Sequence, residues 1–254
     1  MLNYIRSECY RTIRSRSYVI FFGACAVLLV LTSLFMRNTE PFNNTSVSLA
    51  LTLNTFNMVS LLTIGVADMV FCNEYKNQTF KNALAYGYSR NAIYLGKFAT
   101  EVIFAFGIAI AVFGIYLLSV FLLLENPPEA RPMVESYFLL LLGSVPVWLG
   151  CLALAHLCLF FVRGGTAASF LFAGLLVIPD SVFALLGMKE GFGPFCTAIR
   201  ENLLWNQIGH MTTPMMMTGQ MLTPDQLIHP ALVGLGHMVV LLLIGMALFR
   251  RKEI

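Results

Sequence analysis

Four titratable side chains lie inside long apolar stretches of this 254-residue chain, where they could carry protons. A carboxylate or imidazole group buried in a membrane segment is a typical part of a proton pathway, which would make the protein a secondary transporter. No two of the four stand at a spacing that pairs them in sequence. We therefore favour structural roles as buried polar residues, with proton coupling as the alternative, for Glu101, His156, Asp180 and His237.

A second set of polar residues follows one stripe of the stretch 47–71. Asn54, Asn57 and Asp68 recur at helical spacing, and polar groups at bilayer depth must find partners or water. We take Asn54 and Asn57 as candidates for a substrate path, with hydrogen bonding between helices as the plain alternative. For Asp68, near the inner interface, we expect a local pairing with Lys or Arg.

Methionine is concentrated in the segment 188–228, where five Met residues between Met211 and Met221 follow His210. Thioether sulfurs suit Cu(I), but the flexible Met side chain also adapts to varied apolar surfaces. We favour packing at the membrane surface over a plastic surface for substrate, and we predict no metal site. The candidates for substrate contact are Met215, Met216 and Met217.

The sequence lacks the motifs of hydrolytic and nucleotide chemistry. HExxH and GxSxG do not occur, and the stretch around Gly96 and Lys97 lacks the leading Gly and the Ser or Thr of a phosphate-binding loop. We therefore expect no catalytic residue, no cofactor and no nucleic-acid partner for this chain. If ATP and Mg²⁺ drive the activity of this protein, another polypeptide must bind them.

The composition indicates a membrane protein. Hydrophobic residues make up 58% of the chain and charged residues only 11%, against about 25% charged in ordinary soluble domains. The mean hydropathy is +0.77. The apolar residues form long uncharged runs, and about 18–25 such residues are needed for a helix to cross a bilayer core of about 30 Å. We predict an all-α fold with one transmembrane domain over residues 1–254.

Six apolar stretches are long enough to cross a membrane. The first seventeen residues differ from them, because Leu2, Ile5, Cys9 and Ile13 share one helical face and basic residues occupy the opposite one. That pattern is typical of an amphipathic helix lying along the membrane surface. The six spans are predicted at about 18–36, 47–71, 97–123, 136–161, 164–187 and 229–249.

Lys and Arg are distributed unequally between the two sides of these spans. Twelve of them lie in residues 1–17, in the segment 76–97, at Arg163 and at the C-terminus, whereas the opposite side holds only Arg37, Arg131, Lys189 and Arg200. Basic residues accumulate on the cytoplasmic side of membrane proteins. Both termini are therefore predicted to be cytoplasmic, in a protein of the plasma membrane.

The segment 72–96, between the second and third spans, predicts a bent pair of helices. Residues from Glu74 to Tyr86 can form an amphipathic helix. Gly87 supplies the residue that readily adopts the left-handed conformation at which helices end, and Ser89 is a good N-cap for a helix that continues into the third span. Such an element could pass motion from a cytoplasmic partner into the membrane.

The run from Glu74 to Leu84 is similar to the coupling helix of permease subunits of type-two ABC exporters. In that family a Glu is followed four residues on by Gly-Thr and then by apolar and basic residues. Glu74 and Thr79 match this pattern, whereas Gln78 stands where Gly is usual. The resemblance implies that an ATPase docks on this segment and contacts Glu74, Tyr75, Thr79, Lys81 and Arg90.

In its size, the chain resembles the branch of small bacterial permeases that are associated with lantibiotic immunity and bacitracin resistance. The resemblance implies that the chain forms half of a path for an amphipathic or apolar substrate such as an antimicrobial peptide. It implies two ABC ATPase subunits, a second permease subunit, identical or related, and short outer helices between spans five and six. We predict one such helix over 198–208, and a non-transporting membrane sensor or scaffold is the remaining alternative.

Overall fold

Helices are the regular elements of the part of the chain that the structure describes. The computed structural model describes residues 2–40, 42–53, 55–71, 79–162, 164–189 and 191–251. Two short 3-10 turns, η1 (Pro128–Ala130) and η2 (Pro224–Leu227), accompany eleven α-helices in this part. The α-helices are α1 (Leu2–Ile13), α2 (Arg16–Arg37), α3 (Thr45–Leu53), α4 (Phe56–Phe71), α5 (Thr79–Ala85), α6 (Arg90–Leu123), α7 (Arg131–Phe161), α8 (Gly165–Leu186), α9 (Gly193–Glu201), α10 (Leu204–Thr218) and α11 (Ile228–Arg251).

Five of the described helices are long and apolar enough to cross a membrane. They are α2, α6, α7, α8 and α11, and a sixth span results if the bent pair α3 and α4 is counted as one. The structure therefore confirms an all-helical membrane protein. Its longest helix, α6, has 34 residues and starts at Arg90, directly after the predicted N-cap Ser89, so it measures about 51 Å and extends beyond a bilayer core of about 30 Å.

The predicted continuous span over 47–71 is two helices in the structure. The axes of α3 and α4 meet at an angle of 63°. At the junction, the Thr55 backbone NH and hydroxyl both donate to the Thr52 carbonyl, and the Thr52 hydroxyl donates to the Leu49 carbonyl. Short hydroxyl side chains that bond to nearby backbone groups compete with regular helix geometry. Hydropathy alone does not register this competition, so the prediction missed the bend.

The centre of the bundle is α7, which packs against α11, α4, α8 and α10. Its contact with α11 is very close, because a Cβ added at Gly234 would lie 2.4 Å from the Pro146 carbonyl oxygen, and one added at Gly150 would lie 2.8 Å from the Gly234 carbonyl oxygen. Only glycine at these two positions permits such an approach of helix backbones. Pro146 lies inside α7, and its carbonyl group is the part that meets α11.

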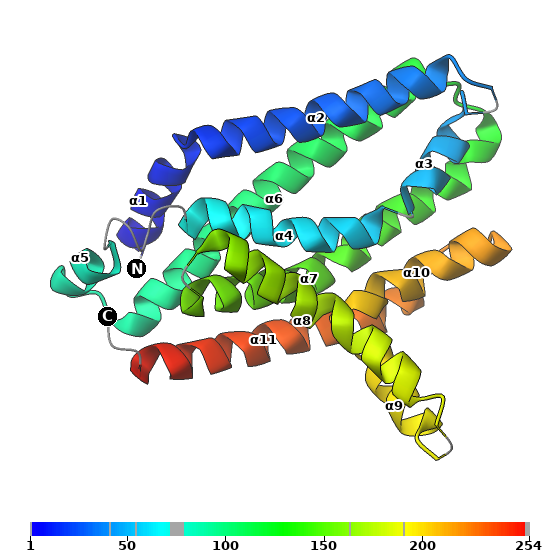
Figure 1. The fold of residues 1–254 in the computed structure, drawn as a ribbon. Coiled ribbons are helices and arrows are strands. Elements are labelled where there is room, and N and C mark those ends of the chain that lie inside the picture. The colour runs from blue at the N-terminus through cyan, green and yellow to red at the C-terminus, as the bar shows by residue number, and fades with distance from the viewer. Residues whose placement is uncertain are drawn as a thin grey trace.

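The bundle has two distinct ends (Figure 1). At one end, the chain after α2 meets the chain after α6, where the Thr45 backbone NH and hydroxyl donate to the Glu125 carbonyl at 3.0 and 3.1 Å. At the other end lie α1, α5, the start of α6 and the last turn of α11 (Figure 1). We call this second one the α1 end. Both termini of the described chain lie there (Figure 1).

Two helices connect α8 to α11 in place of the single predicted helix over 198–208. The break falls at Asn202 and Leu203, between α9 and α10. The Asn202 side-chain amide donates to the Ala198 carbonyl at 2.8 Å, which closes the end of α9. Both helices lie away from the α1 end (Figure 1). The expectation of short helices between the last two spans is met, but their boundaries differ from the predicted ones.

Candidate functional site

The joint between α5 and α6 lies at the α1 end of the bundle and has a complete set of capping interactions. Gly87 has a φ angle of +85°, its NH donates to the Leu84 carbonyl at 2.9 Å, and the Tyr88 NH donates to the Ala83 carbonyl at 3.2 Å. These two bonds form a Schellman motif. The Ser89 hydroxyl then accepts from the Ala92 NH as the N-cap of α6. The predicted bend is thus confirmed at both its glycine and its serine.

Two of the five predicted coupling residues, Glu74 and Tyr75, lie outside the described residues. Thr79 is the first residue of α5, and Lys81 is exposed on it. Arg90 lies one turn beyond the joint, at the start of α6. The structure therefore places the described members of the predicted set around one joint. Whether an ATPase contacts them stays a prediction.

Arg90 also has partners inside this chain. Its guanidinium group donates to the carbonyls of Phe249 and Arg250 at 3.0 and 3.4 Å and lies 5.9 Å from the centre of the Phe249 ring. The last carbonyls of a helix have no partner within that helix and attract a positive charge. Arg250 in turn donates to the Asn91 side chain at 3.1 Å. The start of α6 is therefore tied to the end of α11.

A buried ion pair joins α1 to α6. The Lys97 ammonium group donates to Glu8 Oε2 at 2.8 Å, and Arg11 donates to the same oxygen at 2.7 Å. Burial by itself would raise the pKa of the Glu8 carboxyl, but the two cations outweigh it and the pKa is lower than its usual value. The Lys97 side chain is fully buried. Sequence analysis treated Lys97 only as a marker of topology and did not select Glu8.

The protein-facing side of α1 differs from the face that amphipathicity suggested. Tyr4, Glu8 and Thr12 are its buried residues, and a Cβ added at Gly96 of α6 would lie 2.7 Å from the Tyr4 ring. Leu2, on the apolar face, is 83% exposed. A spacing of four residues between Tyr4, Glu8 and Thr12 was a signal available in the sequence. Ile13, at the other end of this face, is 59% exposed, whereas Cys9 packs against a cluster of buried residues from α4 and α6, so only the two ends of the apolar face are exposed.

A second buried pair joins α6 to α7, one helical turn after Lys97. Glu101 Oε1 and His156 Nδ1 are 2.6 Å apart, and both side chains are fully buried. The imidazole ring lies among four aromatic rings with centroids 4.4–5.5 Å away, those of Phe71, Tyr94, Phe98 and Phe160. Sequence analysis could not pair these residues, because they are 55 positions apart.

Together the two pairs form a continuous polar arrangement, which we call the polar ladder. It runs from Arg11 and Glu8 on α1 through Lys97 and Glu101 on α6 to His156 on α7. Lys97 and Glu101 are four residues apart and therefore lie on the same side of α6. Burying charges is costly unless they are paired. The ladder thus ties three helices together at fixed positions near the α5–α6 joint.

A comparison with known protein families shows which family this chain matches. A family model described as an ABC-2 family transporter protein matches residues 4–180. The chain belongs to the ABC-2 transporter family. The matched residues run from α1 into α8, so they include the α5–α6 joint and the whole polar ladder. No curated protein matches the chain.

Family membership identifies the chain as the multi-pass membrane component, or permease, of an ABC transporter, and it implies an ATPase partner in general. An ATPase is a soluble enzyme, so it must meet the permease outside the bilayer. In the described part of this ABC-2 permease, the α1 end combines an exposed and well-capped joint with buried connections to three spanning helices. These features make the α1 end the candidate functional site.

Two further titratable residues of the permease spans also have partners. Asp180 of α8 accepts from Arg200 at 2.7 Å and from Asn206 at 2.8 Å, which ties α8 to α9 and α10. His237 bonds to the Val233 carbonyl of its own helix at 2.9 Å. Asp68 lies against the first turn of α8, since a Cβ added at Gly165 would lie 2.5 Å from Asp68 Oδ1. The expectation of structural partners for isolated polar residues holds for the first two of these.

The predicted substrate-path residues do not form one cluster in the permease. Asn54 lies outside the described residues, and Asn57 of α4 faces α10, where the position of a Cβ at Gly209 is 4.0 Å from its amide nitrogen. Met215 is buried in the core, whereas Met216 and Met217 are exposed, Met217 by 80%. The structure brings Asn57 near the methionine-bearing helix but separates the methionines between the interior and the surface.

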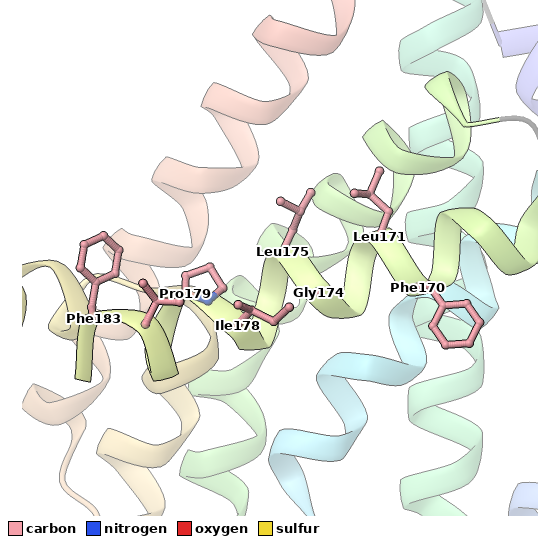
Figure 2. Close-up of a pocket in the computed structure, with 8 residues that line it drawn as sticks. Phe170, Leu171, Gly174, Leu175, Ile178, Pro179 and Phe183 are labelled. Atoms are coloured by element: carbon pink, nitrogen blue, oxygen red, sulfur yellow. The ribbon is translucent and has the colours of Figure 1, made fainter. Parts of the chain in front are cut away.

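An apolar groove runs along the outward face of α8. It has a volume of about 520 Å³, and Figure 2 shows its side chains following the helix from Phe170 to Phe183 around Pro179. Three of the largest, Phe170, Leu175 and Ile178, are 49–77% exposed. This face is available to lipid or to another membrane helix.

Proposed function

We propose that this permease forms half of the pathway of an ATP-driven exporter for an amphipathic or apolar substrate, specifically a peptide. The observation that supports the proposal most is the connection from the capped α5–α6 joint to three spanning helices. A partner that pushed α5 would act at the start of α6, which is a single unbroken helix of 34 residues. Its displacement would be shared with α1, α7 and α11 through the polar ladder and Arg90.

The partners in this proposal follow from the division of labour. Two ABC ATPase subunits bind ATP and Mg²⁺ and dock at the α1 end, and a second permease subunit, identical or related, supplies the other half of the path. The chain itself has no catalytic role. Both termini are cytoplasmic in a bacterial plasma membrane, as the excess of Lys and Arg at this end supports. The proposed branch is that of lantibiotic immunity and bacitracin resistance.

Reversing one exposed charge on α5 tests the docking step. Lys81→Glu is expected to reduce co-purification of the ATPase from gently solubilised membranes, because Lys81 is exposed and is not needed for folding. Lys189→Glu is the matched control, since Lys189 is also an exposed lysine but follows α8, at the opposite end of its span. Equal ATPase recovery with both variants would contradict docking at α5.

The transport step needs its own measurement. Purified complex in vesicles should hydrolyse ATP faster in the presence of a lantibiotic-type peptide, and the peptide should move in an ATP-dependent direction. Stimulation by peptide without movement would favour the sensor alternative. Movement without nucleotide would favour a secondary transporter.

The buried Glu101–His156 pair is the specific observation that favours the second candidate, a proton-coupled transporter. Each group can exchange a proton with the other across 2.6 Å. Under this alternative, a pH gradient alone would drive transport in vesicles, and Glu101→Gln would abolish that transport. Transport that depends on ATP and ignores the gradient would exclude it.

A further inference from the structure

A deep pocket lies between α2 and α4 on the side of the bundle. α2 packs along α6 and diverges from α4, which packs on α7, so the two helices border a wedge (Figure 1). The pocket in this wedge has a volume of about 350 Å³, within the range of about 300–1,000 Å³ of pockets that bind small molecules. Its floor is α6, and Trp148 and Tyr137 of α7 close its end.

The pocket is elongated along the floor helix. Its lining on α6 runs from Ala105 to Tyr116, and eleven residues of helix rise about 16 Å. Phe21, Val66 and Ala105 line the part nearer the α1 end, whereas Thr52, Tyr116 and Tyr137 line the other part. None of the described lining residues carries a charge. The pocket therefore suits a narrow, neutral and apolar molecule.

One polar atom in the lining has no partner. Among the described residues, Trp148 Nε1 is buried and has no hydrogen-bond acceptor. The hydroxyl groups in the same part of the pocket do have hydrogen-bond partners. The Tyr116 hydroxyl is bonded to the Ser48 hydroxyl at 3.0 Å, and the Thr52 hydroxyl donates to the Leu49 carbonyl at 2.8 Å. Less than 1 Å² of this nitrogen is exposed, so an occupant of the pocket would contact the indole ring and not its NH. The indole therefore acts as part of the apolar lining.

The mouth of the pocket opens sideways, within the membrane-spanning segments. Its rim residues Leu28, Met58 and Leu62 are 65%, 53% and 47% exposed. Leu28 lies in the middle of α2, which is long enough to span the bilayer, and the other two lie in α4, which is long enough only together with α3. Lipid chains surround a membrane protein at this depth. A helix of a second copy has a diameter of about 10 Å with its side chains, too wide for a pocket of this volume, whereas an acyl chain is flexible and narrow.

From its volume, its uncharged lining and its sideways mouth we propose that the pocket is a binding site for one acyl chain of a membrane lipid. The chain lies along α6 from Tyr116 toward Ala105 and fills the wedge between α2 and α4. The bound chain replaces the missing packing between these helices, so it stabilises α2 against α4. The site is independent of the ATPase and of the exported substrate.

Photolabelling of the intact transporter tests this site. The purified permease with its co-purifying subunits is placed in vesicles of phosphatidylcholine and phosphatidylglycerol that contain a trace of phosphatidylcholine with a mid-chain diazirine. After illumination, labelled residues are identified by mass spectrometry. The expected label is concentrated on pocket residues such as Val59 and Ala109, above the exposed faces of α8 and α11. Label spread evenly over all exposed apolar faces would overturn the site.

Pocket-filling variants sharpen the result. Ala109→Phe on α6 and Val59→Phe on α4 fill the pocket from different walls, and each should lower pocket labelling about tenfold. Ile110→Phe is the matched control, since Ile110 follows Ala109 on the same helix but is exposed. If one of these two variants fails to fold, the other variant and the labelling pattern of the unmodified protein still test the proposal. Unchanged labelling in a folded filled variant would overturn the proposal.

Oxidation that joins two chains through Cys25, a free thiol in the lining, in place of lipid labelling would assign the pocket to a second copy instead.

Discussion

Lys97, in the third predicted span, donates to Glu8 of the N-terminal helix at 2.8 Å with its side chain fully buried. This contact joins residues 89 positions apart and anchors α1 to the same helix that begins at the α5–α6 joint. An N-terminal helix that only lay on the membrane surface would not need a buried ion pair with a spanning helix. In this permease α1 is therefore packed into the helix bundle rather than attached separately.

Removing Lys97 should destabilise the protein substantially. Lys97→Met leaves the Glu8 carboxylate buried and paired with Arg11 alone of its two described cations, and breaking a buried ion pair costs about 3–5 kcal/mol. The expected result is a lower midpoint of thermal unfolding in detergent. The double variant Glu8→Gln with Lys97→Met should recover part of the loss. A single variant as stable as the parent would show that the pair contributes nothing.

The same pair predicts a pH dependence of stability. The pKa of the Glu8 carboxyl is lower in the folded protein than its ordinary value of 4.5, so the ionised form is favoured by folding. Its contribution to stability is complete above the ordinary pKa and is lost as the pH falls through the lower, folded pKa. Unfolding midpoints of the parent and of Glu8→Gln should therefore converge as the solution is acidified below 4.5. A constant difference at all pH values would contradict this.

The Glu101–His156 pair should be more costly to break than to replace. His156→Leu leaves a fully buried carboxyl group without its imidazole partner, with an expected loss of about 3 kcal/mol or more. The double variant Glu101→Leu with His156→Leu puts apolar groups at both positions and should be clearly more stable than the single one. Chemical denaturation in mild detergent measures all three proteins. A double variant that is the least stable would show that the pair itself is stabilising.

A substitution at Gly87 tests the α5–α6 joint without disturbing any side-chain contact. Its φ of +85° is unfavourable for other residues, and a Cβ there would meet no atom within 4 Å. Gly87→Ala should therefore cost about 1–2 kcal/mol through the backbone alone and should reduce transport per ATP hydrolysed. Gly107→Ala on α6, where a Cβ also meets no atom within 4 Å, should instead be slightly stabilising. Equal behaviour of the two variants would mean that the bend is not required.

Several features of this protein could be predicted because they depend on residues near each other in the chain. Gly87 and Ser89 act within one or two turns of their positions, and both were identified correctly. The spans followed from uninterrupted apolar runs. The bend between α3 and α4 was missed although it is also local, because the hydroxyls of Thr52 and Thr55 act through hydrogen bonds that hydropathy does not measure.

The amino-acid sequence by itself determined a helical membrane protein with a capped joint before its third span, since hydropathy and helix caps are properties of short segments. Only the tertiary structure decided which polar residues meet. Glu8 with Lys97, Glu101 with His156 and Arg90 with the end of α11 are pairs between distant segments. Their partners depend on how the helices pack, because a buried charge takes whichever opposite group the packing places beside it.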